Sequence, residues 1–335
     1  NQSNRVPLYP FLIAGIFKIF GHSFFAVKMV QSIILALSVV LIFIIGKAIF
    51  NTPTGAISGI LASINPNFLR DVHFIMTENL FTFFFLLSIF FLFRGFIYEE
   101  KINYIFFGIS LGFTNLIRPT TVYFPIYLLF MCLFIFWKQR AHLKNILKGL
   151  FIACLISFLM LLPWVARNCL IHKHFVFIST QGPRLFAVSM YKISATETSD
   201  MNILSSDFFN RTNRLTDYER YQEFKKLVRN YISENPKAIW KLVKIIPRRL
   251  SALWSVKDAL RLGSYLGFST PIKFDFFVIP IAFLGIIIGL FSKRKSSLLL
   301  ISIILYFNLV HCVTIADPRY RISFMPFVII FASYF

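Results

Sequence analysis

Four short clusters of polar and charged residues interrupt an otherwise apolar sequence, and each stands beside a long apolar run. They are RDVHFIMTE (70–78), NLIRP (115–119), PWVARN (163–168) and DPRYR (317–321). Ionisable residues next to a membrane are costly to bury and mark pathways or sites by default. The planar guanidinium of arginine can bind two phosphate oxygens at once, and a carboxylate can act as a general base. The clusters therefore indicate a site for a phosphate-bearing ligand.

Two of the clusters have a structural alternative that the residues leave open. Glu78 lies at the expected start of a helix, where it could instead serve as a capping carboxylate. Arg118 lies in a tight turn between two apolar runs and could extend its side chain to the membrane interface. In either case the residue would stabilise the fold without touching a ligand.

The other two clusters also admit two interpretations. Trp164 alone is typical of an interfacial aromatic belt, but Trp beside Arg167 and Asn168 is more typical of a phosphate-facing rim. In the DPRYR cluster Arg319 and Arg321 flank Tyr320, and either arginine could pair with Asp317 to fix a loop.

Composition places these clusters in a membrane protein. The 335 residues are 57% hydrophobic and 18% aromatic, with a mean hydropathy of +0.71. The net charge of +21 is spread between apolar runs and forms no stripe with base-stacking aromatics, which argues against a nucleic-acid partner. Anionic lipid or phosphate and the lipid bilayer are the expected partners. The four cysteines have no metal-ligand spacing, so no metal site is predicted from them.

A bilayer core of about 30 Å needs roughly 20 apolar residues per helix. Nine stretches qualify, and the run 9–20 is too short to span and is expected along the interface. Basic residues crowd the loops 138–148 and 293–295, which places both in the cytoplasm. Alternation then puts all four clusters and the segment 166–275 outside. The nine stretches are 25–48, 54–68, 79–97, 103–117, 120–137, 147–165, 276–291, 297–315 and 323 to the end.

The expected fold class is all-α: a polytopic transmembrane helical bundle with a small extracytoplasmic, mainly helical cap. We expect an N-terminal transmembrane region at 1–165, the cap at 166–275 and a C-terminal transmembrane region at 276–335. Within the cap, apolar residues at helical spacing predict a helix over 218–231, and Asn235-Pro236 should end it before a further helix through Trp254.

The ordered motifs RVPLYPFLIAGIFKIFG, SGILASINPNFLRDVHFIMTENLF, GISLGFTNLIRPT, LPWVARN, FVFISTQG, ENPKAIWKL and DPRYRISFMPF cover nearly the whole chain. In this order they resemble the C-type (GT-C) integral membrane glycosyltransferases. The chain is most similar to the bacterial branch related to protein O-mannosyltransferases and to the lipid A aminoarabinose transferase. Several motifs in order are specific for the superfamily, although they do not identify the acceptor.

The resemblance implies a transferase that takes a sugar from a polyprenyl-phosphate donor on the outer face of the cytoplasmic membrane, with a lipid, glycan or protein as acceptor. The family's main acidic residue follows its first transmembrane helix, so the resemblance places it upstream of Asn1. We therefore expect residues 1–335 to be inactive alone. Glu78 matches a second, supporting acidic position. No cofactor is certain; a divalent cation occurs in some relatives, but the sequence shows no cluster of side chains suited to bind one.

The resemblance also assigns roles to the basic clusters. Arg118, Arg167, Arg319 and Arg321 match basic positions suited to the lipid phosphate, and Asn168 and Tyr320 are expected beside them. A transporter or flippase of an anionic lipid-linked sugar is the alternative, and a non-catalytic scaffold is a third. Transporters usually carry charged residues or broken helices near the midplane, in paired halves, whereas the charges here stand at the outer ends.

Overall fold

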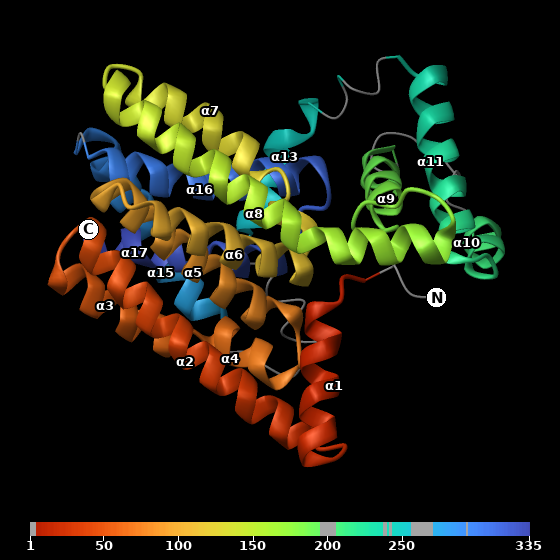
Figure 1. Cartoon of the computed structure of the whole chain (residues 1–335), viewed down its shortest axis with the longest axis horizontal. Helices are drawn as coiled ribbons and strands as arrows, with labels where there is room; N and C mark the ends of the chain where they lie inside the picture. The colour runs from red at the N-terminus through yellow and green to blue at the C-terminus, as the bar shows by residue number, and fades with distance from the viewer. Residues whose placement is uncertain (1–4, 195–205, 237–239, 241–242, 256–270, 293) are drawn as a thin grey trace. The chain divides into compact units, whose positions relative to one another are not determined.

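The structure is a computed structural model that describes residues 5–194, 206–236, 240, 243–255, 271–292 and 294–335. Regular structure in these residues is helical throughout, as the sequence predicts. The α-helices are α1 (Leu8–Phe20), α2 (Phe24–Ile49), α3 (Thr52–Ser63), α4 (Pro66–His73), α5 (Thr77–Tyr98), α6 (Lys101–Ile117), α7 (Phe124–Phe136), α8 (Arg140–His172), α9 (Gly182–Ser194), α10 (Ser206–Asn213), α11 (Asp217–Glu234), α13 (Ile246–Trp254), α15 (Pro271–Phe291), α16 (Lys295–Val313) and α17 (Met325–Tyr334) (Figure 1). Two short 3-10 helices are η1 (Pro119–Thr121) and η3 (Pro318–Ser323).

Six helical segments of the described chain are long and apolar enough to cross a membrane, where the sequence predicted nine spans. They are 24–49, 77–98, 119–136, 140–172, 274–291 and 295–313. The three remaining stretches form shorter helices. α6 has 17 residues and α17 has 10.

The expected span 54–68 is wrong as a single helix. Asn65 leaves the helical conformation before Pro66, and its side chain accepts a hydrogen bond of 2.9 Å from the backbone N–H of Asn67. A residue before proline is driven out of the α region, and proline is favoured in the first turn of the next helix. The helix is therefore divided into α3 and α4. The polar residues of α4 then lie next to the N-terminal end of α5.

Contacts divide the chain into two compact units. The larger comprises Pro7–Leu162, Val256–Phe307 and Arg321–Phe335, and the smaller comprises Asn1–Val6, Pro163–Ser255 and Asn308–Tyr320. This division follows contacts and does not test the predicted boundaries at 165/166 and 275/276, which stay a prediction.

Aromatic packing and small residues hold the larger unit together. Phe85 is fully buried and meets Phe124, Phe307 and Phe327 edge to face, with ring centroids 5.2–5.9 Å apart. α2 and α3 run side by side (Figure 1), and a Cβ on Gly55 would come within 2.6 Å of the carbonyl oxygen of Phe43. Such close approach of membrane helices requires a small residue at the contact.

The smaller unit contains the helical part of the predicted cap. α9, α10 and α11 pack around Phe224, which is 1% exposed. α11 begins with a capping box, in which the Thr216 hydroxyl accepts from the Glu219 N–H and the Glu219 carboxylate accepts from the Thr216 N–H. The predicted helix over 218–231 and its end at Asn235 are confirmed. The following helix is described only in part, and α13 ends at Trp254 as expected.

Candidate active site

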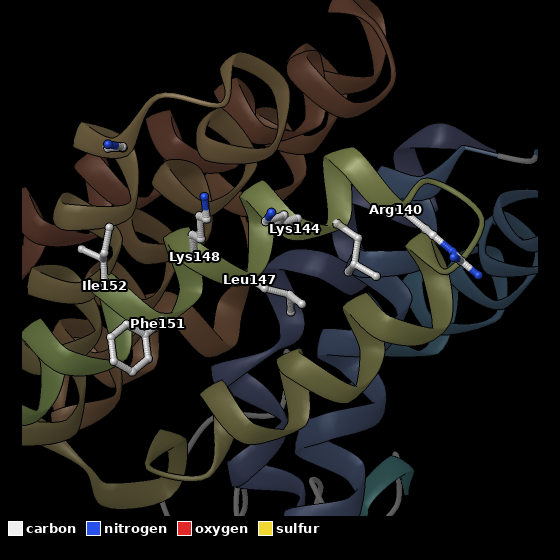
Figure 2. A pocket seen from close by; sticks show the side chains of 8 residues that line it. Arg140, Lys144, Leu147, Lys148, Phe151 and Ile152 are labelled. Carbon is white, nitrogen blue, oxygen red and sulfur yellow. The ribbon is translucent and has the colours of Figure 1, made fainter.

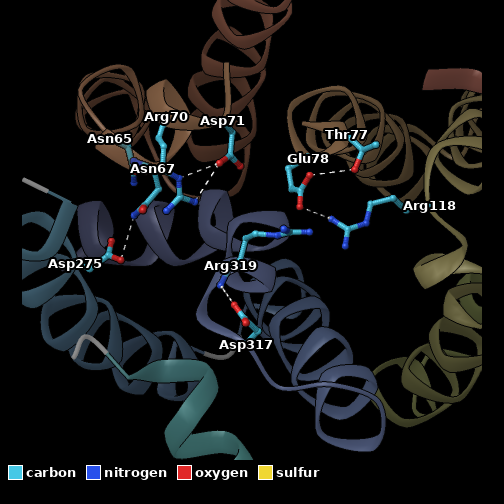
Figure 3. Close-up of polar contacts among 10 residues, drawn as sticks. All are labelled: Asn65, Asn67, Arg70, Asp71, Thr77, Glu78, Arg118, Asp275, Asp317 and Arg319. Atoms are coloured by element: carbon cyan, nitrogen blue, oxygen red, sulfur yellow. Dashed lines mark hydrogen bonds and ion pairs between the residues drawn. The ribbon is translucent and has the colours of Figure 1, made fainter. Parts of the chain in front are cut away.

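An ion pair joins two of the four polar clusters within the larger unit. The carboxylate of Glu78, in the first turn of α5, lies 3.2 Å from the guanidinium of Arg118, which follows the last residue of α6 (Figure 3). Glu78 also accepts a hydrogen bond of 3.0 Å from the Thr77 hydroxyl. The side chains are 2% and 15% exposed, so the pair is largely withdrawn from solvent while part of Arg118 stays accessible.

The turn after α6 fixes the backbone near Arg118. The Thr121 hydroxyl donates to the buried side-chain oxygen of Asn115 across this turn (2.7 Å), and the Tyr306 hydroxyl of α16 donates to the carbonyl of Thr120 (2.7 Å). The Arg118 guanidinium carbon also lies 5.9 Å from the ring centroid of Phe81, one turn along α5 from Glu78. Helix packing therefore holds Arg118 in place on several sides.

α4 contributes a second buried ion pair to the larger unit. The Arg70 guanidinium donates twice to one oxygen of the adjacent Asp71, at 3.1 and 3.2 Å. Both side chains are buried, as is Asn65 at the start of the helix. Figure 3 shows these residues and the Glu78–Arg118 pair projecting from the ends of α4, α5 and α6. The cluster that begins at Arg70 is thus part of a buried polar region.

A buried carboxylate that the sequence analysis missed connects three distant segments. Asp275 of α15 forms an ion pair with Arg321 and accepts a hydrogen bond of 3.2 Å from the side-chain amide of Asn67. Asp275 and Arg321 are 1% and 3% exposed. Of the two arginines that could pair with Asp317, Arg321 pairs instead with Asp275. An acidic residue at the mouth of an apolar run, the signal that singled out Glu78, also marks Asp275.

In the smaller unit, the side chains of Trp164 and Asn168 form hydrogen bonds with the loop that follows α8. The Trp164 indole N–H donates to the carbonyl of Ile178 (2.9 Å), and the amide of the fully buried Asn168 donates to the same oxygen (3.3 Å). The guanidinium of Arg167 stacks over the indole of Trp164, 4.5 Å from the ring, and donates to the side-chain oxygen of Asn168 (3.2 Å). The predicted neighbours Arg167 and Asn168 are thus in contact, and Asn168 has a clear structural role.

The DPRYR cluster forms the start of η3, and its first part belongs to the smaller unit. The Asp317 carboxylate accepts a hydrogen bond of 2.9 Å from the backbone N–H of Arg319, so it caps the turn (Figure 3). Tyr320 stacks flat on His311, with centroids 4.9 Å apart, and the Arg319 guanidinium lies 5.6 Å from the Tyr320 ring. Arg319 and Tyr320 are partly exposed, unlike Arg321.

Arg249 is a further buried cation of the smaller unit that sequence reasoning did not find. Its guanidinium donates to the carbonyls of Cys312 and Ser189 and to the Ser189 hydroxyl, which ties α13 to α9 and to the end of α16. Burial lowers the pKa of this guanidinium from its ordinary value. No group of three or more His, Cys, Asp or Glu side chains in the described residues is arranged to hold a metal ion.

Residues 4–166 match the family of dolichyl-phosphate-mannose-protein mannosyltransferases. The fold is similar to that of an archaeal oligosaccharyltransferase, AglB from Archaeoglobus fulgidus, solved with an inhibitory peptide and a dolichol-phosphate (14% identity, TM-score 0.59). It is also similar to the apo form of the oligosaccharyltransferase from the same organism (12% identity, TM-score 0.61). Each match covers 99% of this chain. The resemblance to the C-type glycosyltransferases is therefore confirmed.

The chain spans 42% of the length of these oligosaccharyltransferases. No curated protein matches it in sequence. The match to the mannosyltransferase family includes Glu78 and Arg118 and ends next to Arg167, whereas Arg319, Tyr320 and Arg321 lie outside it. The Glu78–Arg118 ion pair thus lies within the part of the chain that carries the family's sequence pattern.

Proposed function

We propose that the protein is a membrane glycosyltransferase that moves a sugar from a polyprenyl-phosphate donor to an acceptor on the outer face of the cytoplasmic membrane. The observation that carries this proposal is the Glu78–Arg118 ion pair. It places a carboxylate and a guanidinium together at the ends of two apolar helices, inside the stretch that matches a family of lipid-phosphate-dependent mannosyltransferases.

The proposed reaction is a displacement at the anomeric carbon of the sugar. The acceptor hydroxyl oxygen forms the new bond, and its proton passes to a carboxylate base. The bond from the anomeric carbon to the phosphate oxygen breaks, and polyprenyl phosphate leaves with the electron pair. Negative charge grows on the leaving phosphate, and preorganised guanidinium groups in a site with little water stabilise it strongly. In-line attack inverts the anomeric configuration.

Arg118 is suited to the phosphate although it already contacts Glu78. A guanidinium carries five N–H donors, so it can hold a carboxylate and phosphate oxygens together. Its 15% exposed side chain leaves an approach for the ligand. In this arrangement Glu78 keeps the guanidinium oriented, which supports the secondary role assigned to it from the resemblance.

Arg167 and Arg319 of the smaller unit stay predicted phosphate-binding residues, with Asn168 and Tyr320 beside them. The Arg167 guanidinium is held flat on Trp164, and Asp317 fixes the backbone at Arg319. Arg321 stays a predicted binding residue, although its buried pair with Asp275 favours a positioning role. The dolichol-phosphate and peptide in the oligosaccharyltransferase complex support a lipid-phosphate donor and a protein or glycan acceptor, and a lipid acceptor stays a prediction from the sequence.

Membranes from cells that make the protein from its own gene test this function. Sealed right-side-out and inverted vesicles would receive polyprenyl-phosphate mannose labelled in the sugar, with and without EDTA. We expect label to enter acceptor in right-side-out vesicles, with release of polyprenyl phosphate, and not in vesicles from cells lacking the gene. The EDTA arm decides whether a divalent cation takes part. Movement of the intact donor across the membrane, with its sugar–phosphate bond unbroken, would instead identify a flippase.

A further inference from the structure

A basic groove lies beside the first turns of α8 within the larger unit, and none of the residues assigned to catalysis lines it. It has a volume of about 620 Å³ (Figure 2). Four cations and four apolar side chains line it, and it contains no acidic lining residue. The lining residues are Lys101, Arg140, Leu143, Lys144, Leu147, Lys148, Phe151 and Ile152.

The spacing of these cations places them on one face of α8. Arg140, Lys144 and Lys148 recur every four residues, so their side chains follow one another along the helix, as Figure 2 shows. The opposite face of α8 packs into the bundle, where Ile146 and Ala153 are fully buried. Like charges at this spacing repel one another. The groove therefore attracts an anion.

Nearby carboxylates are engaged elsewhere. Glu99, at the corner between α5 and α6, accepts from the side-chain amide of Asn145 (2.6 Å) and contacts the ring of His142 (2.5 Å). Glu100 accepts from the side chain of Asn103 (2.9 Å). α8 also has no acidic residue in its first turn. The cations there lie beside the positive end of the helix dipole, which is unfavourable for them and favourable for an anion.

The same face of α8 continues as an exposed apolar stripe. It begins at Phe151, which is 71% exposed, and ends at Leu162. At 1.5 Å per residue the stripe rises about 16 Å, which is about half of the 30 Å hydrocarbon core of a bilayer. Its length therefore fits one leaflet. The stripe is formed by Phe151, Leu155, Phe158, Leu159 and Leu162.

From this juxtaposition we propose that α8 carries a binding site for an acidic glycerophospholipid, with the headgroup phosphate among Lys101, Arg140, Lys144 and Lys148 and an acyl chain along the stripe from Phe151 to Leu162. Basic pockets at the ends of membrane helices recognise anionic headgroups. A soluble phosphate would make no use of the apolar stripe, and a neutral lipid would make no use of the cations. We therefore expect an occupant that has both an anionic headgroup and an acyl chain.

Photocrosslinking tests the site in purified protein reconstituted in phosphatidylcholine nanodiscs. The probe is phosphatidylglycerol with a diazirine in one acyl chain, and the labelled peptides are mapped by mass spectrometry. We expect label on α8 between residues 147 and 162. Unlabelled phosphatidylglycerol should compete, whereas phosphatidylcholine and inorganic phosphate should not.

Two charge-matched variants separate a built site from general surface attraction. In the groove variant Arg140, Lys144 and Lys148 are changed to Gln, and we expect labelling of α8 to fall about tenfold or more, since each basic residue near the surface contributes to binding. In the control variant three exposed cations outside the groove are changed to Gln, and labelling should persist. The control cations are Lys47, Arg94 and Lys138.

A third variant controls for loss of labelling through misfolding. Lys144→Arg with Lys148→Arg keeps the charge and should retain labelling, and size-exclusion profiles should match the parent for every variant. Labelling of α8 that survives in the groove variant would overturn the proposal. So would an equal loss in the control variant, or competition by phosphatidylcholine as strong as by phosphatidylglycerol.

Discussion

Glu78 and Arg118 form an ion pair of 3.2 Å between the first turn of α5 and the end of α6. Both charges have the sign that the helix dipoles favour, because a carboxylate is stabilised at a helix N-terminus and a cation at a C-terminus. The end of α5 that carries Glu78 has no capping side chain, since its N-cap residue is Met76. Glu78 therefore combines a favourable place in its helix with a specific partner on another helix.

The first prediction concerns Glu78→Gln in the full-length protein made from its own gene. Glutamine keeps the size of the side chain and a neutral acceptor for Arg118, but it loses the negative charge. We expect turnover on polyprenyl-phosphate mannose to fall on the order of 10². A purely structural role predicts a lower melting temperature with turnover per folded molecule nearly unchanged.

The control for this variant is Glu234→Gln, which removes an exposed carboxylate at the end of α11. Turnover and melting temperature in detergent should both match the parent. If Glu78→Gln also turned over like the parent, Glu78 would return to the role of a helix-terminal charge.

The second prediction concerns topology: the loop before α8 is cytoplasmic and α11 is extracytoplasmic. Single cysteines replace the exposed Gln139 and Gln222 in a background without the native cysteines, and intact cells are treated with a membrane-impermeant thiol reagent. We expect labelling at position 222 only, and labelling at both positions after the cells are opened. Labelling of intact cells at position 139 alone would reverse the orientation and move the proposed site to the other face.

The sequence predicts the long helices well, because a continuous apolar run leaves the backbone few other ways to satisfy its hydrogen bonds in a membrane. The sequence also points to Glu78 and Arg118, since a charged residue at the end of an apolar run is easily recognised. It does not predict that they form an ion pair, because that depends on how α5 packs against α6. The apolar run 54–68 was misleading for a related reason, since the local effect of Asn65-Pro66 outweighs hydropathy.

Arg321 shows why a motif alone assigns roles poorly. In the sequence Arg319 and Arg321 look equivalent, both near Asp317. The 3-10 turn separates them, so that the Asp317 carboxylate meets the backbone of Arg319 while Arg321 reaches Asp275 on α15. Asp275 is distant in sequence, and only the packing of α15 against α4 and η3 brings it to Arg321 and Asn67.

The third prediction concerns acid sensitivity of the cap. Hydrogen bonds from the Thr216 backbone and hydroxyl lower the pKa of Glu219 below its usual range. The folded pKa thus lies below the unfolded value of about 4.3. The stabilisation is present above the unfolded pKa and is lost as pH falls through the folded one.

Amide hydrogen exchange at the start of α11, corrected for intrinsic rates, measures this effect. We expect protection to fall roughly a few-fold between pH 5 and pH 3 in the parent. Glu219→Gln should remove most of this pH dependence because glutamine does not titrate. The last turn of α11 serves as an internal control. A parent whose first turn keeps its protection at pH 3 would contradict the prediction.

The last prediction is that Arg319→Lys and Arg321→Lys damage the protein in different ways. Arg321 is buried against Asp275, and lysine cannot reproduce the guanidinium geometry of that pair, so Arg321→Lys should lower the melting temperature by several degrees. Asp275→Asn removes the charge of the partner carboxylate and should lower the melting temperature by a similar amount.

Arg319 is partly exposed, and its replacement removes a planar guanidinium that suits phosphate oxygens. Arg319→Lys should therefore raise the donor concentration needed for half-maximal transfer about tenfold and leave the melting temperature unchanged. Donor dependence and melting in detergent, measured for each single variant, distinguish the two roles. If Arg319→Lys used the donor as the parent does, the lipid phosphate would be held without Arg319, and Arg118 and Arg167 would be the next arginines to replace.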